Sequence, residues 1–216
     1  MKIPKSGKII PKIGKVYKSS AFNNTKMNAE EKVYRAFFDL KEPKLYYNQI
    51  KEQANLSHSS LQNTLEKLKK ANILSEEKTK ANTFYILKDK KVFALRFSEI
   101  AVQKFNRLNV NVKVPLKNFL KNLPEEIHTI ILFGSASRKE ETKDSDIDIL
   151  IVSNKKIDLA RNKKEAETTS NYPISLFNAT ITQFKENKDH VIIQARKTGF
   201  PIYKEQNFYE VILDGY

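Results

Sequence analysis

The sequence of 216 residues contains no cysteine, which excludes a disulfide scaffold and thiolate metal sites and fits a reducing compartment. It also lacks any apolar run approaching the ~18 residues of a membrane-spanning helix. The N-terminus has no apolar segment of the kind found in secretion signals. We therefore expect a cytoplasmic protein without a membrane partner. A hydrophobic content of 40% over this length leaves room for two small domains, each with a core.

Acidic residues are missing from residues 1–26, which hold seven lysines. Pro4, Gly7, Pro11 and Gly14 would interrupt a helix here, so this segment is predicted to be a basic extended arm. Such an arm could follow DNA phosphates or enter a minor groove. A disordered basic tail explains the same composition equally well.

The formal net charge of +14 is unevenly distributed. Residues 1–92 contain 20 Lys and Arg against 9 Asp and Glu, whereas residues 93–216 contain 19 against 16. The first half would therefore attract duplex DNA through a salt-sensitive field. Lysines that only keep a surface soluble are the alternative explanation.

Residues 27–90 show the pattern of three short helices followed by a hairpin. Asn28 can cap the first helix together with Glu31, and apolar residues recur at helical spacing in all three. A basic hairpin tip separates two short apolar runs. The predicted elements are residues 28–40, 45–54, 57–72, 73–74 and 83–87.

This order resembles the winged helix-turn-helix of transcriptional regulators, which implies that the third helix enters the major groove. Short three-helix domains also serve as protein docking modules, and no single residue decides between the two. The polar outer face of the third helix and the hairpin supply the candidate DNA contacts Ser59, Ser60, Gln62, Asn63, Lys67, Lys70, Lys78 and Lys80.

Residues 91–124 are predicted to be connecting helices, one over 91–108 with Leu95 among its apolar positions and one starting at Pro115. A second domain is expected over residues 125–216. Its aromatic-rich end is expected to cover the core or form an oligomer contact, through Phe200, Tyr203, Phe208, Tyr209 and Tyr216.

The chain contains only five glycines, so a glycine at position 134, within the predicted second domain, suggests a specific structural role. It follows the apolar run 130–133, which reads as a strand, and it precedes a predicted helical turn. A glycine at such a corner lets a polyphosphate approach the backbone, and Ser135 adds a hydroxyl at a helix start. Arg138 is a further candidate for a phosphate contact, although an exposed helical arginine is the commoner case.

After Ser135 and a ten-residue spacer, a second apolar strand carries Asp146 and Asp148. The period of two places both carboxylates on one face of that strand. Two like charges there repel each other unless a cation lies between them, and Mg²⁺ suits such oxygen ligands. The pair therefore indicates a metal and nucleotide site.

The combination of Gly134-Ser135 with the spaced Asp146-Ile147-Asp148 resembles the DNA polymerase β-like nucleotidyltransferases, in particular the minimal ones of archaea and bacteria. The resemblance implies that Gly134 and Ser135 hold a nucleoside triphosphate, and that Asp146 and Asp148 are the catalytic ligands of Mg²⁺ or Mn²⁺. The expected fold class is α+β, with an N-terminal winged helix-turn-helix and a C-terminal nucleotidyltransferase-type mixed sheet with flanking helices.

One departure from that family is a missing third carboxylate. The predicted third strand, residues 174–179, offers only Ser175 and Asn178 as polar groups, and neither is a base at neutral pH. Nucleotide binding is therefore better supported than turnover, because the loss of a general base commonly costs orders of magnitude in rate.

Three functions fit these residues. The first is a DNA-binding regulator whose second domain binds a magnesium-bound nucleoside triphosphate. The second is an enzyme that transfers a nucleotidyl group to a protein, RNA or small-molecule hydroxyl, as relatives in toxin and antitoxin pairs and in antibiotic modification do. The basic domain would then hold the acceptor, and a protein partner of the toxin and antitoxin type is expected as an alternative to DNA. The third is a degenerate module for dimerisation or partner binding. Because winged-helix regulators commonly bind as dimers, a homodimer is also expected.

Overall fold

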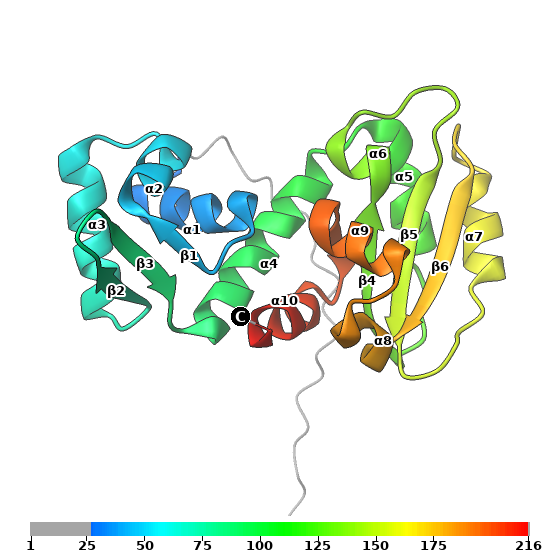
Figure 1. The fold of residues 1–216 in the computed structure, drawn as a ribbon. Helices are drawn as coiled ribbons and strands as arrows, with labels where there is room; N and C mark the ends of the chain where they lie inside the picture. Colours follow the sequence, from blue (N-terminus) through cyan, green and yellow to red (C-terminus); the bar gives the residue numbers. More distant parts are fainter. Residues whose placement is uncertain (1–26, 216) are drawn as a thin grey trace, which may run out of the picture.

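The computed structural model describes residues 27–215, so the predicted arm 1–26 and Tyr216 lie outside the described residues. The described chain has an α+β fold with two lobes, and α4 (Lys90–Asn106) and α10 (Glu205–Asp214) lie between them (Figure 1). Within residues 27–215, no helix combines the length and the apolar content that crossing a membrane requires.

The N-terminal lobe combines three helices with a three-stranded antiparallel sheet in the strand order β1-β3-β2. The first helix begins as predicted, because the Asn28 side chain accepts the Glu31 amide at 2.8 Å and the Glu31 carboxylate accepts the Asn28 amide at 3.0 Å. The elements are α1 (Ala29–Leu40), β1 (Lys44–Tyr46), α2 (Tyr47–Ala54), α3 (His58–Lys70), β2 (Leu74–Lys78) and β3 (Thr83–Leu87).

Helix α3 also starts where the sequence places it. The Ser57 hydroxyl accepts the Ser60 amide at 3.3 Å and caps the helix. Leu61, Leu65 and Leu68 are buried, as helical spacing predicts. One face of α3 is therefore fixed in the core and the opposite face is left to solvent.

Two helix starts predicted from the sequence are wrong. The helix predicted to begin at residue 45 begins at Tyr47, because Leu45 and Tyr46 pair with β3 as part of β1. The helix predicted to begin at Pro115 is α5 (Val110–Phe119), in which Pro115 is internal. The Asn109 carbonyl accepts the amides of Val112 and Lys113, so the first turn is complete before the proline.

Helix α4 is more than a connection. It buries Phe93 and Phe97, whereas Leu95, expected among its apolar positions, is 49% exposed. The Phe97 ring packs against Phe38 of α1 at 5.5 Å and against Tyr209 of α10 at 5.4 Å between centroids. The aromatic C-terminal segment therefore joins the two lobes, with Tyr209 buried as expected of core cover.

The C-terminal lobe is built on a four-stranded mixed sheet in the order β6-β5-β4-β7, in which only β5 and β6 run parallel. In Figure 1, α5 and α7 lie behind this sheet, and α6, α8 and α9 lie in front of it. The elements are β4 (Ile127–Phe133), α6 (Gly134–Arg138), β5 (Ile147–Ser153), α7 (Ala160–Glu167), β6 (Ile174–Thr180), α8 (Ile181–Glu186), α9 (His190–Thr198) and β7 (Phe200–Tyr203).

Candidate functional site

The corner between β4 and α6 is built on Gly134. Phe133 ends the strand in an extended conformation, and Gly134 then adopts a φ of +72°, which L side chains rarely take. The Gly134 carbonyl accepts hydrogen bonds from the Ser137 hydroxyl at 2.8 Å and from the Arg138 guanidinium at 3.0 Å. The turn is therefore fixed by contacts of its own residues.

Glycine is required at this corner because of Asp148. A Cβ at residue 134 would overlap the Oδ2 atom of Asp148, so the carboxylate lies directly against the backbone of the turn. Asp148 lies on β5, an inner strand of the sheet, where it is in register with Phe133 of β4 and with Ser175 of β6. The Gly-Ser corner and this aspartate therefore form one site.

Asp146 completes the carboxylate pair from the position just before β5. Its Oδ2 atom accepts a hydrogen bond of 2.8 Å from the Ser175 hydroxyl. Burial, and after it the charge of Asp146, raises the pKa of Asp148 above its usual value. The two carboxylates thus interact with each other, and a cation between them would relieve the repulsion.

Ser135 and Arg138 differ in what they can offer a phosphate. The Ser135 hydroxyl is half-buried and has no hydrogen-bond partner within residues 27–215. The Arg138 guanidinium, in contrast, donates to the Gly134 carbonyl and, at 2.6 Å, to Glu140. A contact of Arg138 with phosphate stays a prediction. The guanidinium would first have to break its hydrogen bonds with Gly134 and Glu140.

A third carboxylate is absent from the described part of the site. Residues 27–215 contain no group of three His, Cys, Asp or Glu side chains that could hold a metal ion. The residue beside the pair on the neighbouring strand is Ser175, and Asn178 is exposed further along the same strand. Sequence alone could not show that Ser175 touches Asp146, because this depends on the register in which the parallel strands β5 and β6 pair.

Comparison with known families agrees with this geometry. Residues 115–208 match the family described as Polymerase beta, Nucleotidyltransferase. This segment contains the glycine corner, both aspartates and the whole sheet, so the C-terminal lobe is a nucleotidyltransferase-type domain. Searches among curated proteins and among solved structures found no match.

The candidate DNA contacts of the N-terminal lobe lie on the outer face of α3 and along the β2–β3 hairpin. Ser60 is half-buried, and the others are exposed: Ser59, Gln62, Asn63, Lys67, Lys70, Lys78 and Lys80. The structure therefore brings these residues to the surface, although their contact with DNA stays a prediction.

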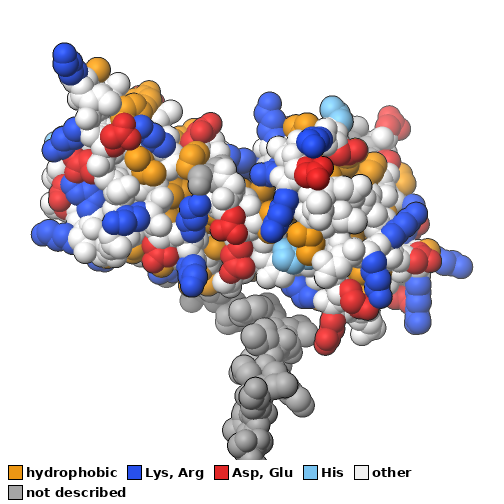
Figure 2. Space-filling view, turned by 60° about the horizontal axis from the view of Figure 1, so that its bottom comes forward, with side chains coloured by type: hydrophobic (Ala, Val, Ile, Leu, Met, Phe, Trp, Pro, Cys, Tyr) orange, Lys and Arg blue, Asp and Glu red, His pale blue; other side chains and the backbone are white. Residues whose placement is uncertain are grey.

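Ion pairs reduce the free positive charge of this face. Lys67 pairs with Glu30 of α1 at 2.9 Å, and Lys78 pairs with Glu76 at 3.1 Å. Residues 27–90 hold 12 Lys and Arg against 9 Asp and Glu, so most of the basic excess of the first half belongs to residues 1–26. On the face drawn in Figure 2, cationic and acidic side chains are interspersed over both lobes. Among the candidate DNA contacts, Lys67 and Lys78 would therefore have to leave these pairs before acting on phosphates.

Proposed function

We propose that this protein is a DNA-binding, transcriptional regulator-like protein whose nucleotidyltransferase-type domain binds a nucleoside triphosphate with Mg²⁺ or Mn²⁺. The nucleotide-binding part of this proposal rests on the position of Asp148. Its carboxylate lies against the backbone of Gly134 and close enough to Asp146 to feel its charge. A phosphate seated at Ser135 and a cation held by the two aspartates would share this one site.

The residues present fit a hard divalent cation. Mg²⁺ prefers carboxylate oxygens, commonly takes one or two of them, and completes its shell with water and substrate phosphate. When bound, the ion would neutralise the aspartate pair and the charge of the triphosphate. Asp146 and Asp148 are the residues that would hold it, with Gly134 and Ser135 under the phosphates.

Binding is proposed rather than turnover. Transfer of a nucleotidyl group to a protein, RNA or small-molecule hydroxyl needs a base for that hydroxyl. Ser175, which stands beside the aspartate pair, is neutral and donates its proton to Asp146 in a hydrogen bond. The site as built is therefore better suited to hold a nucleotide than to activate an acceptor.

Calorimetric titration tests whether this site binds a nucleoside triphosphate. Wild type, Asp146→Asn and Asp148→Asn are titrated with each nucleoside triphosphate in Mg²⁺. We expect about a tenfold or larger loss of affinity in both variants, because each removes a charged ligand. Asp144→Asn is the matched control, since Asp144 is exposed in the loop before β5. Equal affinity in wild type and in the two site variants would refute the nucleotide assignment.

The proposed DNA binding is supported by the order of elements in the N-terminal lobe. Three helices are followed by the β2–β3 hairpin, and α3 presents polar side chains on its outer face. This arrangement suits a winged helix-turn-helix that places α3 in the major groove. Lys70 and Lys80 are exposed and have no ion-pair partner within residues 27–215, so they are the cations that would meet phosphates first.

Fluorescence anisotropy with labelled duplex DNA over a series of salt concentrations tests the DNA half. Replacing Lys70 and Lys80 with alanine should lower the slope of log affinity against log salt by roughly two. The control is Lys156→Ala with Lys164→Ala, which removes the same charge from exposed positions of the C-terminal lobe. Duplex binding that is absent, or that does not change with salt, would remove this part of the proposal.

A further inference from the structure

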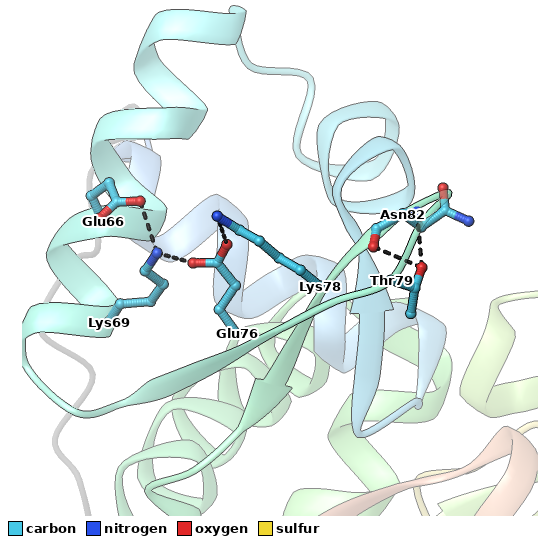
Figure 3. Close-up of polar contacts among 6 residues, drawn as sticks. All are labelled: Glu66, Lys69, Glu76, Lys78, Thr79 and Asn82. Atoms are coloured by element: carbon cyan, nitrogen blue, oxygen red, sulfur yellow. Dashed lines mark hydrogen bonds and ion pairs between the residues drawn. The ribbon is translucent and has the colours of Figure 1, made fainter.

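An open groove of about 360 Å³ lies in the N-terminal lobe, away from the aspartate pair. Its walls come from the junction of β1 and α2, the first turns of α3, and the β2–β3 hairpin. Part of the hairpin wall is visible in Figure 3, where Glu76 and Lys78 of β2 and Asn82 of the turn are drawn. The lining residues are Tyr46, Tyr47, Asn48, His58, Gln62, Glu76, Lys78, Ala81, Asn82, Thr83 and Tyr85.

Neutral hydrogen-bonding side chains without partners gather in this groove. Within residues 27–215, the side chains of Asn48, Gln62, Asn82 and Thr83 make no hydrogen bond, and neither does the hydroxyl of Tyr85, a residue only 3% exposed. Asn48, Gln62 and Asn82 are exposed and Thr83 is half-buried, so these side chains are open to partners from outside the protein. A ligand with several donors and acceptors would supply them.

The charged residues of the groove are already paired. Glu76 binds Lys69 of α3 through one carboxylate oxygen and Lys78 through the other, at 3.1 Å, as Figure 3 shows. These contacts, foremost the one with Lys69, lower the pKa of Glu76. Since Lys78 and Glu76 offset each other, the groove favours a neutral group over a phosphate or a carboxylate.

The aromatic wall is held in place before any ligand arrives. The Tyr47 hydroxyl and the His58 Nδ1 atom are 2.8 Å apart, and the two rings meet edge to face at 5.5 Å between centroids. This contact joins the start of α2 to the start of α3. Tyr46 is positioned by a further edge contact with Phe84 at 6.4 Å. Fixed aromatic rings beside free amide groups are the means by which proteins hold unpaired bases.

We propose that this groove binds an unpaired nucleobase of a single-stranded nucleic acid that lies beside α3. The base stacks on the aromatic wall, and its edge meets the free groups of Asn48, Gln62 and Tyr85. Lys80, next in sequence to Ala81 of the lining, is available for the adjacent phosphate. The inference rests on the proposed nucleic-acid role of this lobe and specifies the form of nucleic acid that the groove takes.

The test compares single-stranded DNA, single-stranded RNA and duplex DNA of equal length by fluorescence anisotropy at one salt concentration. The full-length wild type is compared with Asn48→Ala combined with Tyr85→Phe, which removes two hydrogen-bonding groups and keeps the buried ring. We expect single-strand affinity to fall about tenfold, because each lost hydrogen bond weakens binding several-fold. Tyr172→Phe with Asn178→Ala in the C-terminal lobe is the matched control, and thermal melting checks that every variant folds.

The outcomes separate this inference from the proposed function. Duplex binding without single-strand binding would overturn the inference and leave the DNA proposal standing. Single-strand binding that falls in the groove variant, with no duplex binding, would support the inference and refute the duplex proposal. Single-strand affinity equal in wild type and groove variant would overturn the inference.

A cross-linking experiment gives a second readout that does not depend on the variants. A single strand carrying 5-iodouracil is irradiated with the wild-type protein, and the modified peptide is identified by mass spectrometry. We expect attachment to Tyr46, Tyr47 or His58, the exposed or half-exposed rings of the lining. Attachment only outside the groove would contradict the inference.

Discussion

The carboxylate of Asp148 lies against the backbone of Gly134, in the space that a side chain at residue 134 would occupy. Two features read separately from the sequence, a glycine corner and a spaced aspartate pair, are therefore parts of one construction. The acid is held close to the turn because that turn has no Cβ. A side chain at residue 134 would therefore have to displace the Asp148 carboxylate.

Replacing Gly134 with alanine should destabilise the protein by about 1–3 kcal/mol, because the new Cβ overlaps Asp148 and the φ of +72° is unfavourable for alanine. Urea denaturation measures the free energy of unfolding. Gly215→Ala is the control, since Gly215 has a φ of −82° and a Cβ there would only touch the Ile212 carbonyl at 3.5 Å. A Gly134→Ala protein as stable as Gly215→Ala would show that the corner is not constrained.

Replacing Asp148 with asparagine should stabilise the metal-free protein at neutral pH. Burial, and secondarily Asp146, raises the pKa of Asp148 in the folded state above the unfolded value of 3.8. Such a carboxyl destabilises the folded state once the pH exceeds its folded pKa, and that cost disappears below the unfolded pKa. The stability gained by the variant should therefore shrink as the pH falls through this window.

Urea denaturation in a chelating buffer, from neutral pH down to about pH 4, measures that change in the free energy of unfolding. Asp144→Asn, in the exposed loop, should show no comparable gain. An Asp148→Asn protein that is less stable than wild type at neutral pH would contradict the repulsion between the two aspartates.

Introducing a third carboxylate at Ser175 should change the chemistry of the site. Ser175 is in register with Asp148, and its hydroxyl donates a hydrogen bond to Asp146. Ser175→Asp would therefore place a third carboxylate beside the aspartate pair. We expect a protein that is less stable without metal and regains stability in Mg²⁺ or Mn²⁺. We also expect transfer of the nucleotidyl group from a nucleoside triphosphate to water, measured as pyrophosphate released, to be about tenfold or more faster than in wild type.

Asn178→Asp is the matched control for that substitution. Asn178 belongs to the same strand but is in register with Ile151 and is exposed. The same acid there should leave both metal dependence and pyrophosphate release unchanged. If both variants behave alike, the missing carboxylate does not limit turnover at this site.

Replacing Lys41 with methionine should loosen the junction of the lobes. The Lys41 ammonium, at the end of α1, donates to the carbonyls of Arg196, Lys197 and Gly199 at 3.1, 2.7 and 3.1 Å, which caps the C-terminus of α9. Its loss should cost about 1–2 kcal/mol. Lys51→Met, an exposed lysine on α2, is the control for thermal denaturation. Equal melting temperatures would show that this cap does not contribute.

Local signals in the sequence predicted much of the fold. The Asn28 and Glu31 pair marked the start of α1, Ser57 marked α3, and the alternation around Asp146 and Asp148 marked β5. Each of these depends on residues within a few positions of one another. Helix capping and the two-residue period of a strand both depend on neighbouring residues, so they can be recognised in the sequence alone.

Features that depend on distant pairing could not be predicted in this way. Strand β1 has three residues and exists only through its pairing with β3. The bond from Ser175 to Asp146 requires the parallel register of β5 and β6. The Lys67–Glu30 pair, which reduces the free charge of α3, joins residues on different helices. Charge counts along the sequence therefore overstated the free positive charge of the N-terminal lobe.

Thermal denaturation of the full-length protein with Mg²⁺, with a nucleoside triphosphate, and with both together tests the central claim most directly. A ligand present at about 100 times its Kd stabilises the native state by about 2.7 kcal/mol. The account predicts a rise of several degrees in the melting temperature with both ligands together, little with either alone, and none in Asp148→Asn. A melting temperature unchanged by all four nucleotides with Mg²⁺, or raised equally in Asp148→Asn, would contradict it.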